Sequence, residues 1–151
     1  MSIALLAPVP EEHLISGQAT LQETGKVAFG SNSWELFYKL RDILKGGECD
    51  VLLYASDAAR PLNPPTATWS ATFVGFSEAV NGAHKNGLRY RPLSTTKYPL
   101  DNEGHWAIFW EIKDLRQMNA GVKISLLRGF ERPNPYLENF IPRGPILIRK
   151  V

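Results

Sequence analysis

The chain has 151 residues, a formal net charge of +2 and a composition that is 44% hydrophobic and 21% charged. This length is typical of one domain, and the composition excludes an intrinsically disordered protein. The single cysteine, Cys49, excludes an intrachain disulfide, and the three histidines lack metal-ligand spacing, so we expect no metal and no cofactor. No apolar run reaches the roughly 20 residues that span a bilayer, and residues 1–10 lack the basic start of a signal peptide. We therefore expect a cytoplasmic protein without a membrane partner.

The residue pattern in about the first third of the chain predicts strands that alternate with helices. The strongest helix prediction is 34–45, whose apolar side chains recur every three or four residues. Ser31 or Ser33 is placed to cap its start, and two glycines follow its end. The predicted elements are a strand at 2–7 that Pro8 and Pro10 stop, a helix at 11–21, a strand at 26–30, the helix at 34–45 and an apolar strand at 50–56.

The remainder of the chain predicts mainly strands. Residues 68–80 indicate a long strand bent at Gly75, and residues 105–113 indicate another. Because no long helix separates these two strands, we expect them to pair antiparallel. The other predictions are a long loop at 81–103, one helical turn at 114–118, a short strand or helix at 121–127, an irregular segment at 131–143 and a final strand at 145–151. The order of elements predicts an α+β fold with a mixed, curled sheet or small barrel and one or two flanking helices.

The charges are distributed unevenly along the chain. Residues 1–83 carry a net charge of −4, whereas residues 84–151 carry +6. Lys85, Arg89, Arg91 and Lys97 lie in a stretch that contains no acidic residue. A basic segment of this kind is typical of a phosphate-binding surface, and it is equally typical of a solvated loop.

Three segments of the chain form a characteristic order: residues 26–56 read KVAFGSNSWELFYKLRDILKGGECDVLLYAS, residues 69–80 contain Val-Gly-Phe, and residues 106–115 read WAIFWEIKDL. This order of motifs resembles the PUA-like superfamily, in particular its EVE, YTH and ASCH branches. The resemblance covers about residues 24–118. It implies one PUA-like domain over residues 1–151, with a mixed, curled β-barrel of about five or six strands flanked by helices.

The resemblance also implies a function, because EVE and YTH domains hold a modified or flipped base in an aromatic-lined pocket. The pattern departs from these families at the polar turn, where Phe29 precedes the turn and the tryptophan follows it. Each matching residue also has a purely structural interpretation, since tryptophans pack in cores and serines cap helices. The matching positions for base binding are Ser31, Asn32, Ser33, Trp34, Tyr54, Ser56, Trp69 and Trp106.

The expected partner is nucleic acid, either RNA or modified DNA, together with a separately encoded nuclease or modification enzyme. The candidate phosphate contacts are Lys85, Arg89, Arg91, Lys97, Arg128 and Arg132. Two alternatives stay open. One is an ASCH-type amidohydrolase that acts on an acylated nucleoside through Lys26, Ser31 and Glu78, and the other is a non-catalytic protein-interaction domain.

Overall fold

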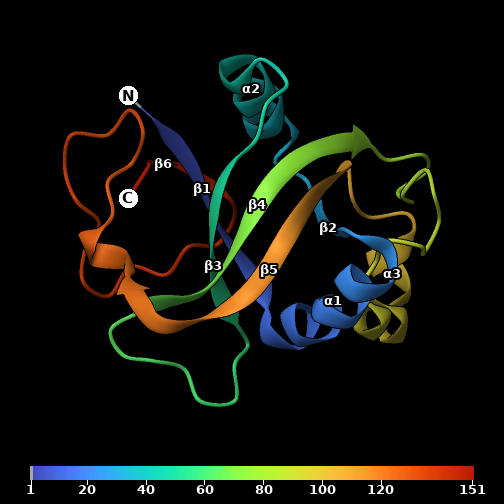
Figure 1. Ribbon diagram of the computed structural model, residues 1–151, viewed down its shortest axis with the longest axis horizontal. Helices are drawn as coiled ribbons and strands as arrows, with labels where there is room; N and C mark the ends of the chain where they lie inside the picture. Colours follow the sequence, from blue (N-terminus) through green and yellow to red (C-terminus); the bar gives the residue numbers. More distant parts are fainter. Residues whose placement is uncertain (1) are drawn as a thin grey trace.

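A six-stranded mixed sheet organises this computed structural model, which describes residues 2–151. The strands lie in the order β2-β5-β4-β3-β1-β6, and only β1 and β3 pair in parallel (Figure 1). Figure 1 shows α1 beside α3 and away from α2. The elements are β1 (Ile3–Pro10), α1 (Glu11–Thr24), β2 (Val27–Ser31), α2 (Trp34–Leu44), β3 (Cys49–Ser56), β4 (Thr66–Glu78), α3 (Pro99–Asn102), β5 (Ile108–Lys123) and β6 (Ile146–Arg149). The predicted α+β class is confirmed.

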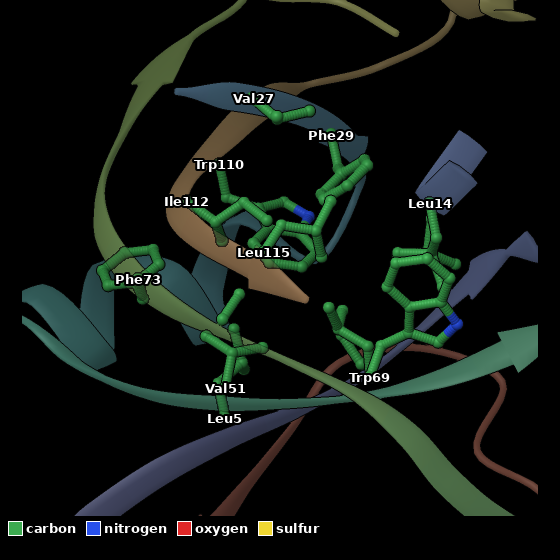
Figure 2. Packing of buried hydrophobic residues seen from close by; sticks show 14 of the residues in the cluster. Leu5, Leu14, Val27, Phe29, Val51, Trp69, Phe73, Trp110, Ile112 and Leu115 are labelled. Carbon is green, nitrogen blue, oxygen red and sulfur yellow. The ribbon is translucent and has the colours of Figure 1, made fainter. Parts of the chain in front are cut away.

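The sheet curls around the larger of the two hydrophobic clusters in the described residues, which is the main core. Buried side chains from strands that are far apart in the strand order, such as Leu5 on β1 and Phe29 on β2, belong to this cluster. Figure 2 shows these two residues around a common interior with Phe73 and Ile112 from the central strands. Across residues 2–151 no ladder joins β2 to β6, so these two strands are the edges of an open sheet.

The predicted starts of both long helices in the first half of the chain are confirmed. The helix α2 begins at the predicted residue, and Phe37 and Leu40 on its apolar face are fully buried. Ser33 occupies the N-cap position but makes no side-chain capping bond, and its backbone N–H instead donates to Ser31 Oγ at 3.0 Å. The helix α1 also begins where predicted and extends three residues further.

The strand β1 corrects the prediction that Pro8 and Pro10 would end it. β6 pairs with β1 only between Ile3 and Leu6, so one edge of β1 has no neighbouring strand beyond that point. A proline can occupy such an edge because no ladder hydrogen bond is lost there. The extension matters because it carries β1 to the start of α1.

The strand β5 corrects the prediction of a helical turn at 114–118. It continues to Lys123, since the long strand β4 supplies antiparallel partners as far as Thr66. Asp114 has a φ of 54°, and shifts in the β4–β5 register absorb this irregularity. The predicted bend at Gly75 is confirmed by another register shift, and the predicted antiparallel pairing is also confirmed.

The long segment 81–103 folds back over the outer edge of β2. The Ala28 N–H donates to the Tyr90 carbonyl at 2.8 Å, and Arg91 Nη1 donates to the Ala28 carbonyl at 2.7 Å. The segment therefore places Arg91 and Asp101 beside the ends of β1 and β2. Among the described helices, none combines the length and apolar character needed to cross a membrane.

Candidate functional site

A cavity of about 230 Å³ lies between the ends of β1 and β2 and the segment that leads into β5. Its walls combine three aromatic rings with five polar side chains. The lining residues are Ala7, Pro8, Val9, Pro10, His13, Phe29, Gly30, Ser31, Arg91, Thr95, Asp101, Trp106, Trp110 and Pro145. We call this space the aromatic cavity.

The aromatic walls are held rigidly. Phe29 and Trp110 lie on the paired strands β2 and β5, with ring centroids 5.1 Å apart (Figure 2). Trp106 packs directly on Gly30, where a methyl group would overlap its indole ring. The Trp106 Nε1–H donates to Asp101 Oδ1 at 3.0 Å, which fixes the orientation of the ring.

Asp101 is the acidic centre of the aromatic cavity. Besides Trp106, its carboxylate faces Arg91 Nη2 at 3.5 Å and His13 Nε2 at 3.4 Å. Burial alone would raise the pKa of Asp101, but the hydrogen bonds from His13 and Trp106 and the charge of Arg91 outweigh it. The pKa therefore lies below its usual value, and the group is a carboxylate at neutral pH.

Arg91 is a fixed part of the wall. It is only 5% exposed, and its guanidinium donates to Asn102 Oδ1 at 2.8 Å, to the Ala28 carbonyl and to the Asp101 carbonyl at 2.9 Å. Burial lowers the pKa of Arg91 to about 10, although Asp101 opposes this effect, so the side chain stays charged at neutral pH. Its donors are committed within the protein.

His13 links Asp101 to Ser94, which creates the order of contacts found in serine hydrolases. His13 Nδ1 lies 2.6 Å from Ser94 Oγ. However, Ser94 does not line the aromatic cavity, its hydroxyl also donates to the Glu12 carbonyl at 3.3 Å, and its N–H donates to Ser16 Oγ at 3.0 Å. A nucleophile needs access to a substrate, so these bonds serve to fasten the segment 93–102 to α1.

A second cleft of about 470 Å³ adjoins the aromatic cavity. The two spaces share Pro10, His13 and Asp101. We call the second cleft the acidic vestibule; it is lined by Pro10, Glu11, Glu12, His13, Asp57, Tyr98 and Asp101.

The opposite wall of the aromatic cavity has a different character. Pro145 lines both the cavity and a groove of about 400 Å³ that runs between α2 and β6. Arg132 lines this groove, and Arg128 and Arg143 are exposed on the same C-terminal segment. We call these three arginines the basic side.

Two of the predicted base-binding residues, Ser31 and Trp106, line the aromatic cavity. Asn32 holds the neighbouring backbone, because its Oδ1 accepts the Ala107 N–H at 2.8 Å. Ser33 occupies the N-cap position of α2 without a side-chain capping bond, and Trp34 is 47% exposed on the outside of that helix. These three residues flank the cavity without lining it.

The other three predicted base-binding residues lie elsewhere. Trp69 is 3% exposed in the main core, contrary to its expected place in the pocket, and its Nε1 has no hydrogen-bond partner in the described chain. Tyr54 packs against a second hydrophobic cluster, and Ser56 pairs in register with Pro10. Alternation along β3 places Tyr54 and Ser56 on the face of the second cluster, whereas Trp69 faces the main core but does not line the cavity.

The predicted phosphate contacts divide into two groups. Arg91 is buried, so the prediction that it contacts phosphate at the surface is corrected, because this part of the segment 81–103 folds inward. Lys97 is 66% exposed and pairs with Glu12 at 3.3 Å beside the acidic vestibule. Lys85, Arg89, Arg128 and Arg132 are exposed.

The three residues of the hydrolase alternative are not brought together. Lys26 and Ser31 lie at opposite ends of β2, about 16 Å apart at the usual rise of a strand. Lys26 Nζ pairs with Glu111 at 3.1 Å. Glu78 lies on β4, which β5 separates from β2, and its carboxylate accepts the Tyr38 hydroxyl. No common reaction centre results.

Comparisons with known proteins give no assignment. No family model, curated protein or solved structure matches this chain. Within residues 2–151, no group of three or more His, Cys, Asp or Glu side chains is arranged to hold a metal ion.

Four wall residues were not predicted from the sequence, namely Phe29, His13, Asp101 and Trp110. One signal was available for Trp110: it lies four residues after Trp106 in an extended stretch, which places both on one face of the strand. His13 and Asp101 are far apart in the sequence, and only the fold of segment 81–103 over β2 brings them together.

Proposed function

We propose that the protein binds single-stranded nucleic acid and holds one flipped or unpaired base in the aromatic cavity. The observation that carries this proposal is a cavity walled by Phe29, Trp106 and Trp110, with Asp101 and Ser31 beside the rings. A modified base is the favoured occupant, since an added methyl group gains contact with an aromatic wall. The finer fold, a PUA-like β-barrel, belongs to the same proposal, and the curled sheet around the main core supports it.

The size of the cavity favours a single planar group. Its volume of about 230 Å³ lies below the range of about 300–1,000 Å³ typical of sites for drug-sized ligands. Aromatic stacking contributes about 1–3 kcal/mol per base. The Asp101 carboxylate accepts hydrogen bonds from ring or exocyclic N–H groups, and the Ser31 hydroxyl both donates and accepts.

The charges around the cavity indicate the course of the nucleic-acid backbone. The acidic vestibule repels phosphates, whereas the basic side offers Arg128, Arg132 and Arg143. Gly144 lies close to the turn before α2, since a Cβ there would be 3.8 Å from Ser33 Oγ. The exposed ring of Trp34 follows that turn and is available to stack on a neighbouring base.

The decisive experiment is a titration of the full chain with single-stranded RNA and DNA oligonucleotides, unmodified or methylated at one base, at two salt concentrations. Trp106→Ala should weaken binding by roughly 10- to 100-fold, in line with the loss of one stacking wall. Arg143→Glu should weaken binding and reduce its salt dependence, because one phosphate contact is lost.

Arg116→Glu is the matched control, because Arg116 is exposed beside a separate cleft near Asp50 and Ser70. It should leave both the affinity and the salt dependence unchanged. Absence of binding to every oligonucleotide, or binding that Trp106→Ala leaves intact, would overturn the proposal.

A further inference from the structure

The acidic vestibule has an unusual charge for the entrance to a base-binding cavity. Four of its seven lining residues are carboxylates, Glu11, Glu12, Asp57 and Asp101, and none of the seven is a lysine or arginine. The Tyr98 hydroxyl donates to Glu12 Oε1 at 2.5 Å, and this hydrogen bond is the main cause of the lowered pKa of Glu12. Glu12 is therefore ionised at neutral pH.

The nearby cations neutralise only part of the vestibule. Lys97 pairs with Glu12 at 3.3 Å and offsets one of the four carboxylates. Arg91 faces Asp101 at 3.5 Å and offsets a second, whereas Glu11 and Asp57 take part in no ion pair within residues 2–151. The entrance keeps an excess of negative charge, which attracts cations and repels phosphates.

Inside the aromatic cavity, a cation can contact the half-buried Trp106 ring and the Asp101 carboxylate. The rings of Phe29 and Trp110 are 4% and 2% exposed, so they close the wall behind these groups. Asp101 Oδ1 accepts the hydrogen bond from Trp106, whereas Oδ2 has only the long 3.4 Å contact with His13. A carboxylate oxygen has two lone-pair sites, so Oδ2 retains capacity for a further donor.

We propose that the aromatic cavity selects a nucleobase that carries a positive charge on its ring, an inference that rests on the proposed base-binding function. Alkylation of a ring nitrogen, such as N1 of adenine or N3 of cytosine, creates this charge while the ring stays planar. Methylation of the exocyclic nitrogen of adenine or of C5 of cytosine leaves the base neutral. The chemical class is thus a ring-alkylated cationic base.

Isomeric modified bases test this proposal. The full chain is titrated with oligonucleotides of one sequence that contain 1-methyladenine or N6-methyladenine, and 3-methylcytosine or 5-methylcytosine. The two members of each pair have the same heavy atoms, and at neutral pH the ring-methylated member carries one additional proton and is therefore positively charged. The cationic isomer should bind about tenfold more tightly, and added salt should reduce this ratio because the vestibule is open to solvent.

Variants assign the preference to the vestibule. Glu11→Gln and Asp57→Asn should each reduce the ratio of the two dissociation constants by about two- to fivefold. Glu23→Gln is the matched control, since Glu23 is an exposed carboxylate at the far end of α1, and it should leave the ratio unchanged.

The outcomes separate the two proposals. Equal affinity for the isomers, or tighter binding of the neutral isomer, with loss of binding in Trp106→Ala, overturns the charge preference and leaves the base pocket standing. Binding that is independent of Trp106, or absent for all four oligonucleotides, overturns both.

Discussion

Two buried clusters of charge lie under the segment 81–103, and they are built from similar parts. In the first, Asp101 faces His13 and Arg91 at 3.4 and 3.5 Å. In the second, Glu111 faces His84 at 2.9 Å and Lys26 at 3.1 Å. Each cluster thus joins one carboxylate to one histidine and one basic side chain.

The difference between the clusters lies in how completely each carboxylate is satisfied. Both oxygens of Glu111 have short partners, and none of the residues in its cluster lines the aromatic cavity. The contacts of Asp101 with His13 and Arg91 are longer, and all three members of its cluster line the cavity. The comparison indicates that the Glu111 cluster stabilises the fold, whereas the Asp101 cluster stabilises the fold and also presents a ligand-binding group.

The largest effect is expected from Arg91→Leu. This change leaves the Asp101 carboxylate and the Ala28 carbonyl without their buried donor. Breaking a buried ion pair from one side costs about 3–5 kcal/mol, so the free energy of unfolding should fall by that amount in urea denaturation. Arg89→Leu is the control: Arg89 is exposed two residues earlier and should cost less than about 1 kcal/mol. Equal losses in the two variants would contradict the assigned role of Arg91.

Helices and strands were predictable from the sequence where periodicity is local. The apolar face of α2 and the alternation in β4 both arise from neighbouring residues. The proline-containing end of β1 and the far half of β5 were not predictable, because each depends on which strand lies alongside. For the site, Ser31 and Trp106 were predicted from the resemblance, whereas His13, Arg91 and Asp101 meet only through a long segment without regular pattern.

Glu111→Gln tests the second cluster. The amide keeps the shape of the side chain but removes the charge that Lys26 and His84 face. Hydrogen bonds to charged groups contribute about 1.5–3 kcal/mol, and a loss of this size is expected. Base binding should be unaffected, because the cluster is separate from the aromatic cavity. A loss of binding without a loss of stability would reverse the roles of the two clusters.

The pH dependence of stability sharpens the same test. Burial raises the pKa of Glu111, but hydrogen bonds from His84 and Lys26 outweigh this effect and leave the pKa below the ordinary value of 4.5. Between the lowered pKa of the folded state and the ordinary pKa of the unfolded chain, the unfolded chain binds more protons than the folded chain. The free energy of unfolding should therefore fall as pH drops below about 4.5. Urea denaturation from pH 6 to pH 3 should show a shallower fall in Glu111→Gln than in the native chain.

Gly30→Ala tests the wall that accompanies the Asp101 cluster. A methyl group at this position overlaps the indole of Trp106, so the ring must move away from Asp101. Overpacking of this kind typically costs about 1–3 kcal/mol, and base binding should weaken with it. The double variant Gly30→Ala, Trp106→Ala is the control, because the methyl group then has space. If the losses in free energy of unfolding are additive in the double variant, the methyl group at position 30 and the Trp106 ring do not clash.

The smallest change in stability is expected from Lys97→Ala at the rim of the acidic vestibule. Its ion pair with Glu12 joins side chains that are 66% and 37% exposed, and such pairs contribute less than about 1 kcal/mol. Removing Lys97 nevertheless exposes one more carboxylate to an entering ligand, so the preference for the cationic isomer should increase. Lys113→Ala removes a similar exposed pair, with Glu48 at 3.1 Å, away from the vestibule and should leave the preference unchanged. An unchanged preference in Lys97→Ala as well would mean that the Asp101 cluster acts without help from the vestibule.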